Sequence, residues 1–584
     1  MPEAGRGSPP PSVVFPQSVA SGDPAPDGAL LWTRVDMPAL ALTGPVTLGW
    51  TVAADPEFRT VLVTGTTVTD QSRDGTVKVF VSDPALRPAT HYWYRFTALG
   101  TASRSGRLRT LPEPDSALHS LRLGYASCQD WTNGYFIALG ALADQDVDYV
   151  LHLGDYVYEA ARSSATGTVR ALSLPSGSDT AQTLADYRSL YRTYKTDPDL
   201  QRCHERHTFL AIWDDHEFAD DCYGVHASGT ADPAPQPERR AAATRAWAEF
   251  SPTACHLTSG QAPPGSVEFD PGQSADRQVR LWREVRFGTL VHAVLTDERL
   301  HRDAHPCGEQ VSDKYLVPGC AEVSAPGRTM LGAAQRDWLV QTLGSSGAAW
   351  KLWANQTMLM QLKLGSAHLS ALLALLPRPV ADRLRRHLHG AGDGLFVNLD
   401  QWDGYQAERA GIARTLIDAR VTDLVTMTGD LHSSVAGWSR VDYDAPPPID
   451  FPAVLARRTV DPTPARGDLL GTCFMATSVS AANLVERFGM ALSRRLHIPV
   501  HHLNRPVGRA LEWMLAHANP HLALFESGSH GFNVAEFTDT ELTVTMWAVA
   551  SVAEAGACQV RAGHRFLVPR QTAPDAAPLI HRLR

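Results

Sequence analysis

Hydrophobic and polar residues follow two different patterns along this 584-residue chain. From about residue 15 to residue 110, short runs of β-branched and aromatic residues are separated by turn signals rich in Gly, Asp and Pro. The runs are TLGWTVA, VLVTGTTV, TVKVFVS and HYWYRFTALG. This rhythm predicts a small N-terminal β-sandwich domain at residues 12–112, with Trp32 and Trp50 in its core.

From Leu121 onward, short apolar strands alternate with longer helical patterns. The predicted helices are Tyr135 to Ala143, Ala241 to Phe250, Ala333 to Leu343 and Gln406 to Ala419. This pattern is typical of the α/β (or α+β) class, and we assign residues 118–558 to one catalytic domain. Helical insertions are predicted near 366–394 and 484–514, and residues 559–584 read as a polar C-terminal tail that can fold back.

Composition and charge limit the possible partners. The formal net charge of -9 argues against sequence-specific nucleic-acid binding and against binding to anionic membranes, because both need a cationic face. The longest apolar stretch, near residues 369–380, is interrupted by prolines and too short to span a bilayer. The first residues hold no apolar run typical of a signal peptide, so export and a cytoplasmic location both remain open.

The eight cysteines form no CxxC pair, which argues against a zinc ribbon or a thioredoxin-like site. Cys307 and Cys320 lie in one polar loop that contains Gly and Pro. They can form a disulfide in an exported protein, and two free thiols are an equal alternative.

Unusual polar residues follow six apolar, strand-like runs. They are Cys128 after LRLGYAS, Asp155 and Tyr158 after DYVLHLG, Asp215 and His216 after TFLAIW, Arg299 after LVHAVL, Asn355 after AWKLWA, and Asp430 and His432 after DLVTMTG. Ligands bind at the carboxyl ends of strands in α/β sheets, because the loops there converge on one edge. Taken one at a time, these residues also fit structural roles: a buried thiol, a helix cap, a packed tyrosine or a turn asparagine. Their shared position at strand ends favours a metal site.

The residue types indicate two neighbouring cations. A thiolate, a phenolate and an imidazole around one ion favour a transition metal. A neighbour lined by Asp and Asn oxygens suits a hard cation such as Ca²⁺. Paired ions about 3.5–4 Å apart suit in-line displacement at phosphorus, and Asp155 is the candidate bridge.

Ten segments in order along nearly the whole chain carry a family resemblance. They are SVASGDPAPDGALLWTRV, YASCQDW, LHLGDYVYE, IWDDHEFADD, TDERLHRD, LGAAQRDWL, ANQTM, NLDQWDGYQAER, TGDLHSS and SHGF. With these the chain resembles the PhoD-like alkaline phosphatase/phosphodiesterase family of the calcineurin-like metallophosphoesterases. The resemblance implies a four-layer αββα sandwich preceded by the small β-sandwich.

The resemblance also implies roles for individual residues. Iron(III) is expected at Cys128, Asp155, Tyr158 and His432, and calcium or another divalent cation at Asp155, Asp215, Asn355 and Asp430. His216 is expected to donate a hydrogen bond to the phosphoryl group or to the leaving oxygen. Arg299 and Arg302 are expected to hold the substrate anion, and His530 to lie near the substrate.

Three features depart from the family pattern. Asp220 and Asp221 stand where relatives often carry asparagine, and Ser529 precedes His530 where an arginine is common. The twin-arginine leader usual in the family is absent from the chain as given. The first two features bear on substrate preference, and the third bears on export.

The expected activity is metal-dependent hydrolysis of phosphomonoesters or phosphodiesters, small or polymeric, by a monomer. One alternative is a catalytically inactive metal-binding scaffold whose sandwich binds a partner. Another is redox chemistry at the iron. A non-haem iron oxygenase favours two histidines and one carboxylate, and an oxygen-lined second site argues against it.

Overall fold

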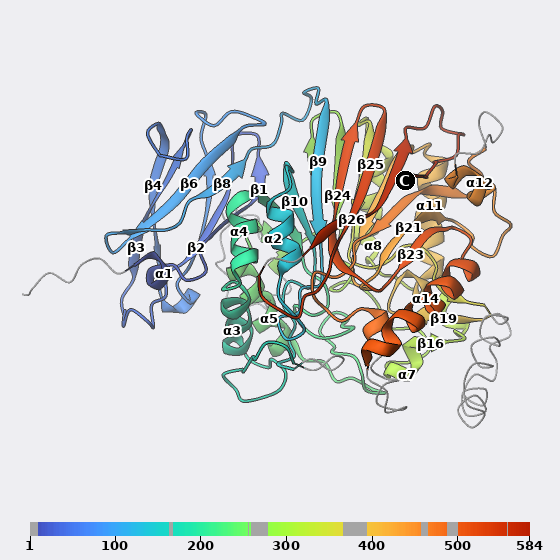
Figure 1. Ribbon diagram of the computed structural model, residues 1–584, viewed down its shortest axis with the longest axis horizontal. Helices are drawn as coiled ribbons and strands as arrows, with labels where there is room; N and C mark the ends of the chain where they lie inside the picture. Colours follow the sequence, from blue (N-terminus) through green and yellow to red (C-terminus); the bar gives the residue numbers. More distant parts are fainter. Residues whose placement is uncertain are drawn as a thin grey trace, which may run out of the picture.

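A computed structural model describes residues 10–162, 168–254, 256–257, 278–365, 394–456, 465–487, 500–556 and 559–583. Two large β-sheets pack against each other in its centre, and helices cover their outer faces (Figure 1). The N-terminal strands form a lobe at one end of the long axis, drawn in blue.

The first sheet has ten strands. Their order is β27 (His581–Leu583), β26 (Val560–Pro569), β25 (Glu541–Val549), β24 (His530–Thr538), β9 (Ser120–Ala126), β10 (Tyr149–Leu153), β11 (Thr208–Ile212), β1 (Val19–Ala25), β2 (Gly28–Arg34) and β5 (Thr76–Ser82). Neighbours within the run β9, β10, β11 and β1 are parallel. All residues of β10 and β11 are buried, as expected for parallel strands covered on both faces.

The second sheet has seven strands. Their order is β14 (Arg283–Phe287), β15 (Val291–Leu295), β17 (Trp350–Ala354), β20 (Leu424–Thr428), β22 (Leu469–Met475), β21 (Ser434–Arg440) and β23 (Leu522–Glu526). The central strands β15, β17, β20 and β22 are parallel, so their carboxyl ends share one edge.

Helices form the two outer layers. The ten-stranded sheet is covered by α2 (Ile137–Ala143), α3 (Leu184–Tyr194), α4 (Pro198–Arg206) and α5 (Pro237–Phe250). The seven-stranded sheet is covered by α8 (Ala333–Gly344) and α11 (Gln406–Asp418), whose Leu339 and Leu416 pack in one cluster with Trp353. The layers are thus helix, sheet, sheet, helix, which confirms the predicted fold, and α2, α5, α8 and α11 confirm the four predicted helices.

The N-terminal lobe is a sandwich that shares a sheet with the rest of the molecule. Its outer sheet contains β3 (Val46–Ala53), β4 (Val61–Thr69), β6 (His91–Ala98), β7 (Thr101–Ala102) and β8 (Gly106–Arg109). Its other sheet is β1, β2 and β5, which is the end of the ten-stranded sheet. The parallel pair β1–β11 makes this connection, with Ser21 opposite Thr208.

The structure corrects the predicted position of Trp32. Its side chain is buried in the main core beside Phe250, with ring centroids 6.1 Å apart, and its indole N–H donates to the Glu249 carbonyl at 2.9 Å. Trp50 does pack against the core of the N-terminal lobe, as predicted. Alternate residues of a strand point to opposite faces, and Trp32 points to the face covered by α5.

The remaining elements are short or lie at the periphery. They are α1 (Pro11–Val14), η1 (Gln71–Arg73), β12 (His256–Leu257), β13 (Val279–Arg280), α7 (Val311–Lys314), β16 (Tyr315–Val317), η2 (Ala321–Ser324), β18 (Lys363–Leu364), β19 (Leu395–Asn398), η3 (Trp402–Gly404), α12 (Phe451–Leu455) and α14 (Val500–Ala518). None of the helices in the described ranges is long and apolar enough to cross a bilayer.

The predicted insertions and tail have different outcomes. Positions 366–393 and 488–499 lie outside the described residues. Residues 484–487 are helical, and α14 covers the end of the second predicted insertion. Residues 559–584, predicted as a tail, contribute β26 and β27 to the ten-stranded sheet, because β26 pairs along its whole length with β25.

Candidate metal centre

The strand ends of both sheets meet at one place. Cys128, Asp155 and Asp215 follow β9, β10 and β11 of the ten-stranded sheet. Asn355 follows β17 of the seven-stranded sheet, and the turn between β20 and β21 carries Asp430 and His432. The candidate ligands therefore lie between the two sheets, on loops that rigid strands hold in place.

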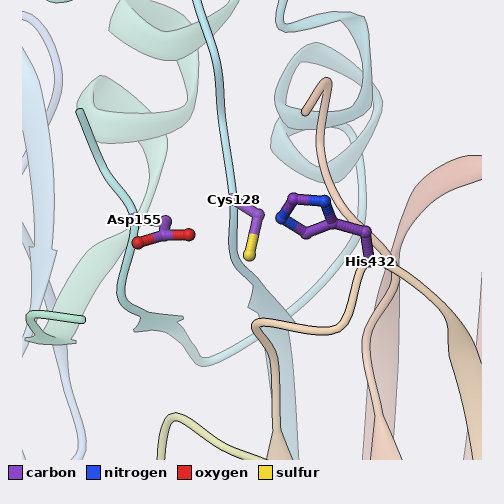
Figure 2. A group of neighbouring side chains, drawn as sticks. All are labelled: Cys128, Asp155 and His432. Atoms are coloured by element: carbon purple, nitrogen blue, oxygen red, sulfur yellow. The ribbon is translucent and has the colours of Figure 1, made fainter. Parts of the chain in front are cut away.

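A first group contains sulfur, oxygen and nitrogen donors. One ligand atom each of Cys128, Asp155 and His432 lies within 4.8 Å of the others, and Figure 2 shows the three side chains pointing toward one another. The Tyr158 hydroxyl is 2.9 Å from Asp155 Oδ2 and 3.1 Å from His432 Nε2. All four side chains are buried, so a cation held here would be removed from solvent.

A second group shares Asp155 and is built from oxygens. Carboxylate oxygens of Asp155, Asp214, Asp215 and Asp430 lie within 4.8 Å of one another. Asn355 is fully buried, yet neither its Oδ1 nor its Nδ2 has a hydrogen-bond partner within the described structure, and the same holds for Asp215 Oδ1. A buried polar group without a partner costs about 1–3 kcal/mol. A cation ligated by these oxygens removes that cost, so the donor set fits a hard metal ion.

Four candidate ligands have strained backbones. Cys128, Asp155, Asp430 and His432 have φ angles of 61°, 57°, 68° and 53°. These values lie in the left-handed region, which residues other than glycine adopt infrequently. Such conformations cluster at functional sites, where the surrounding structure imposes them.

His432 is held in the tautomer that a metal ligand needs. Its Nδ1 lies 2.8 Å from the Ala482 carbonyl, which only accepts, so Nδ1 carries the proton. Burial, assisted by the positive charge of Arg487, lowers the pKa of His432 to about 3. The imidazole is therefore neutral, with the lone pair of Nε2 directed to the side of Tyr158.

The electrostatics of the protein alone favour cation binding. Burial, together with the charge of Asp215, raises the pKa of Asp155 well above its usual range. Burial is also the main cause that raises the pKa of Asp430 to about 8, and it raises the pKa values of the Cys128 thiol and the Tyr158 phenol. A bound cation reverses these shifts, because it stabilises the deprotonated ligands.

His216 lies at the edge of the centre as a charged donor. Burial opposes protonation, but the carboxylates of Glu159, Asp215 and Asp155 outweigh it and raise the pKa of His216 well above the usual value. Its Nδ1 contacts Glu159 Oε2 at 2.7 Å, and its ring packs on Tyr158 with centroids 4.0 Å apart. The orientation leaves Nε2 available to a ligand, with Asp220 Oδ1 at 3.4 Å.

Glu217 holds two of the ligand loops, a role that the sequence did not reveal. Its Oε2 accepts from the backbone N–H groups of Asp155 at 3.0 Å and Asp214 at 2.7 Å. Its Oε1 accepts from the Tyr156 N–H at 2.6 Å. This carboxylate therefore fixes the ends of β10 and β11 relative to each other.

Arg299 and Arg302, predicted to hold the substrate anion, lie beneath the metal centre among carboxylates. Both side chains are fully buried, and Asp400 binds both, with an oxygen at 2.9 Å from each guanidinium. Arg299 also contacts Asp214 at 2.5 Å and Asp430 at 3.4 Å. Neither arginine lines the cavity at the metal centre. Their positive charge instead balances the buried carboxylates beside the centre.

Asp400 and Gln401 complete this support and were not singled out from the sequence. Asp400 Oδ1 also contacts His305 Nε2 at 2.7 Å, and the two arginines hold the pKa of Asp400 well below its usual range against the effect of burial. The Gln401 amide donates to Asp430 Oδ2. The signal that could have found them is the polar pair that follows Leu399, one residue after the end of β19.

His530 does not face the metal centre. Its Nδ1 lies 3.0 Å from Ser478 Oγ and its Nε2 lies 3.2 Å from Glu486 Oε1. The side chain is buried and, among the described residues, it is not part of the lining of the metal cavity, so its predicted position near the substrate stays a prediction. His530 instead connects β24 to the helical segment that carries Glu486.

The negative charge of Asp221 is balanced by Lys314, which lies in a loop that a disulfide closes. Lys314 Nζ lies 2.6 Å from Asp221 Oδ2, and the Tyr315 hydroxyl donates to the same carboxylate at 3.0 Å. Cys307 and Cys320, whose Cα atoms are 5.8 Å apart, form the disulfide on either side of Lys314 and Tyr315. Of the two alternatives open from the sequence, the structure has the disulfide.

Comparisons with known proteins agree with this geometry. The family model for PhoD-like phosphatase matches residues 123–546, and the model for the PhoD-like phosphatase N-terminal domain matches residues 3–112. Alkaline phosphatase D of Bacillus subtilis (strain 168) is 30% identical over 444 residues, which are 74% of this chain and 67% of the relative. A solved structure described as "Structure of PhoD" has the same fold, with a TM-score of 0.75 and 24% identity over 100% of this chain and 94% of that chain. The chain therefore belongs to the PhoD-like phosphatase family, a family of phosphoric ester hydrolases, as the resemblance predicted.

Proposed function

We propose that this chain hydrolyses phosphate monoesters or diesters at a centre that holds iron(III) beside a divalent cation such as calcium. The iron ligands are Cys128, Asp155, Tyr158 and His432, and the second cation is bound by Asp155, Asp215, Asn355 and Asp430. The observation that carries this proposal is the buried Asn355 amide, unpartnered within the described structure, in a centre where thiol, phenol and imidazole groups meet four carboxylates.

When bound, the cations supply positive charge that lowers the pKa of water and stabilises the phosphoryl oxygens. The protein's own residues orient the ester and donate a proton to it. His216 carries a proton at the edge of the cavity, so it donates to a phosphoryl oxygen or to the leaving oxygen, and Glu159 fixes the direction of its ring.

The test is elemental analysis of protein purified without chelators, combined with turnover of p-nitrophenyl phosphate and bis(p-nitrophenyl) phosphate. We expect iron and a divalent cation in near-equal amounts, and hydrolysis of one or both esters that is lost after chelation. Hydrolysis that persists after complete metal removal contradicts the proposal, and so does a fully metal-loaded protein that hydrolyses neither ester.

Two variants separate the two sites. Asn355→Ala is expected to lower the content of the divalent cation and leave iron bound, because Asn355 belongs only to the oxygen-lined group. Cys128→Ala is expected to lower iron content first. Equal loss of both metals in both variants would show that the proposed division of ligands is wrong.

A further inference from the structure

A second cavity adjoins the one at the metal centre. The metal cavity has a volume of about 40 Å³ and is lined by Asp155, Asp215, Asp430 and His432, among others. The second has about 190 Å³ and is lined by Tyr158, Glu159 and Arg162, among others. His216, Asp220 and Arg487 line both, so the two cavities meet at these three side chains.

The sizes assign different parts of an ester to the two cavities. One water molecule needs about 10–15 Å³ of cavity volume, so the metal cavity has room for a few water-sized groups, such as the oxygens of a phosphoryl group, and for little more. An apolar cavity of about 150 Å³ accepts a benzene ring, so the second cavity can hold a leaving group of that size. The leaving group lies on the side of His216, which is the proton donor of the proposed function.

Arg487 is the cation at the junction of the two cavities. The charged residues in the described lining of the metal cavity are five aspartates and His216, and Arg487 is the one lysine or arginine there. Its Nε donates to the Ala482 carbonyl at 3.2 Å. Within the described part of the chain, no carboxylate lies at ion-pair distance from its guanidinium, so its other N–H groups are available to an anion.

Side-chain hydrogen bonds fix the backbone that leads into Arg487. Asn483 and Glu486 bond reciprocally, with the Glu486 N–H 2.9 Å from Asn483 Oδ1 and the Asn483 N–H 3.1 Å from Glu486 Oε2. Glu486 also contacts His530 of β24. The Ala482 carbonyl that accepts from Arg487 accepts from His432 as well, which fixes the arginine relative to the metal centre.

The buried acids of the second cavity already have partners. Glu159 is bound by His216, and Asp130 accepts from the N–H and the hydroxyl of Thr132, both at 2.8 Å. Arg162, at the outer side, pairs with Asp179 while both side chains stay largely exposed. The remaining acid, Asp220, is 60% exposed and lies 3.4 Å from His216 Nε2. The arginines available to a negative group in this cavity are Arg487 at the junction and Arg162 at the outer side.

We propose that the second cavity is the leaving-group subsite and that Arg487 makes it selective for esters whose leaving group carries its own negative charge. This inference rests on the proposed phosphoesterase function and adds the substrate class. Charge-assisted hydrogen bonds contribute more than neutral ones, so the selectivity depends on the guanidinium.

The experiment compares two esters that differ in one charge: 4-carboxy-2-nitrophenyl phosphate and its 4-carbamoyl analogue. The wild-type holoenzyme is expected to prefer the carboxylate in kcat/KM. Arg487→Gln is expected to lower kcat/KM for the carboxylate ester by about 10-fold to 100-fold and for the carboxamide ester by about 3-fold or less. Arg487→Lys is expected to keep part of the preference, and Arg162→Gln to lose less of it.

The control is Arg59→Gln, which removes an arginine that is 77% exposed on the N-terminal lobe and leaves both rates unchanged. An equal loss for both esters in Arg487→Gln overturns the proposal, because Arg487 then acts on the transferred phosphoryl group. Equal rates for the two esters with wild type overturn it too.

Binding of the free phenols, 4-hydroxy-3-nitrobenzoate and its amide, tests the subsite without catalysis. Wild type is expected to bind the carboxylate at least about 10-fold more tightly, and Arg487→Gln to bind both alike. Absence of hydrolysis contradicts the proposed function, whereas absence of this difference in binding contradicts the subsite.

Discussion

The floor and the rim of the centre are built in different ways. The floor consists of Cys128, Asp155, Asp215, Asn355 and His432, whose exposed fractions lie between 0% and 5%. The rim consists of residues 481–487 and the disulfide-closed loop 307–320, and it includes the exposed Arg487. Floor residues follow strands of two packed sheets, whereas the rim is attached by individual side-chain contacts.

Arginines of the two regions have different partners. Arg299 and Arg302 are buried under the floor, where both pair with Asp400 and Arg302 also contacts the Tyr405 hydroxyl, so they stabilise the centre. Arg487 lines the two cavities, so it can meet a substrate. Arginine therefore stabilises the structure under the floor, whereas at the rim it contributes to the proposed substrate selectivity.

Removing the shared floor ligand is expected to have the largest effect. Asp155→Ala removes the ligand that we propose for both cation sites, so kcat/KM for p-nitrophenyl phosphate should fall by at least about 1,000-fold, together with the metal content. Elemental analysis and steady-state kinetics measure both losses. Asp146→Ala, at a side chain that is 98% exposed, is the matched control. If the Asp155→Ala protein is active without metal, the floor residues take no part in catalysis.

Breaking the buried arginine support is expected to cost stability. Arg302→Gln leaves part of the charge of Asp400 unpaired, and the loss of one partner of a buried ion pair costs about 3–5 kcal/mol. Urea unfolding of the metal-loaded protein measures this loss in the free energy of unfolding. Arg336→Gln, which removes a half-exposed pair with Asp337, should cost less than about 1 kcal/mol. Equal stability of the two variants would mean that Arg302 is not a structural support.

Opening the loop of the rim is expected to have a smaller effect. The double variant Cys307→Ser/Cys320→Ser opens a loop with a sequence separation of 13 and should lower the free energy of unfolding by about 2–3 kcal/mol. Turnover should fall less than in Asp155→Ala, because Lys314 and Tyr315 contact Asp221 and not the shared ligand. Wild type treated with a reductant is the control and should match the double variant. A loss of metal as large as in Asp155→Ala would show that the rim contributes as much to metal binding as the floor does.

The pH dependence of the metal-free protein tests the floor through stability alone, without a substitution. The pKa of Asp430 is about 8 in the folded protein and about 4 in an unfolded chain, so the folded state holds the proton more tightly. Its contribution to stability is complete below about pH 4 and is lost as pH rises toward 8, at most about 1.4 kcal/mol per pH unit. Melting curves with chelator between pH 5 and 8 should show falling Tm, and metal-loaded protein should not. The same fall with metal bound would mean that Asp430 is not a ligand.

Much of the floor could be predicted from the sequence, because its residues sit directly after apolar runs. Cys128, Asp155 and Asp430 each follow a strand, and parallel strands bring their carboxyl ends together. The role of Glu217 could not be predicted, since it depends on which backbone N–H groups lie near its carboxylate.

Burial and long-range pairing account for what the sequence did not reveal. Charge in a motif does not tell whether an arginine faces a cavity or a carboxylate, so the sequence does not predict the pair of Arg302 with Asp400. Arg487 lies in an insertion without a motif. The pairing of Ser21 with Thr208 joins residues 187 positions apart, and periodicity reports only which face of a strand is buried, not its partner.

The shared sheet makes the N-terminal lobe inseparable from the enzyme. A fragment that starts after residue 112 would leave β11 as an open edge, with backbone groups free to recruit strands from other molecules. The space now filled by Trp32 between β2 and α5 would become a void in the main core. Recombining this lobe among relatives therefore means exchanging three of the ten strands of a continuous sheet.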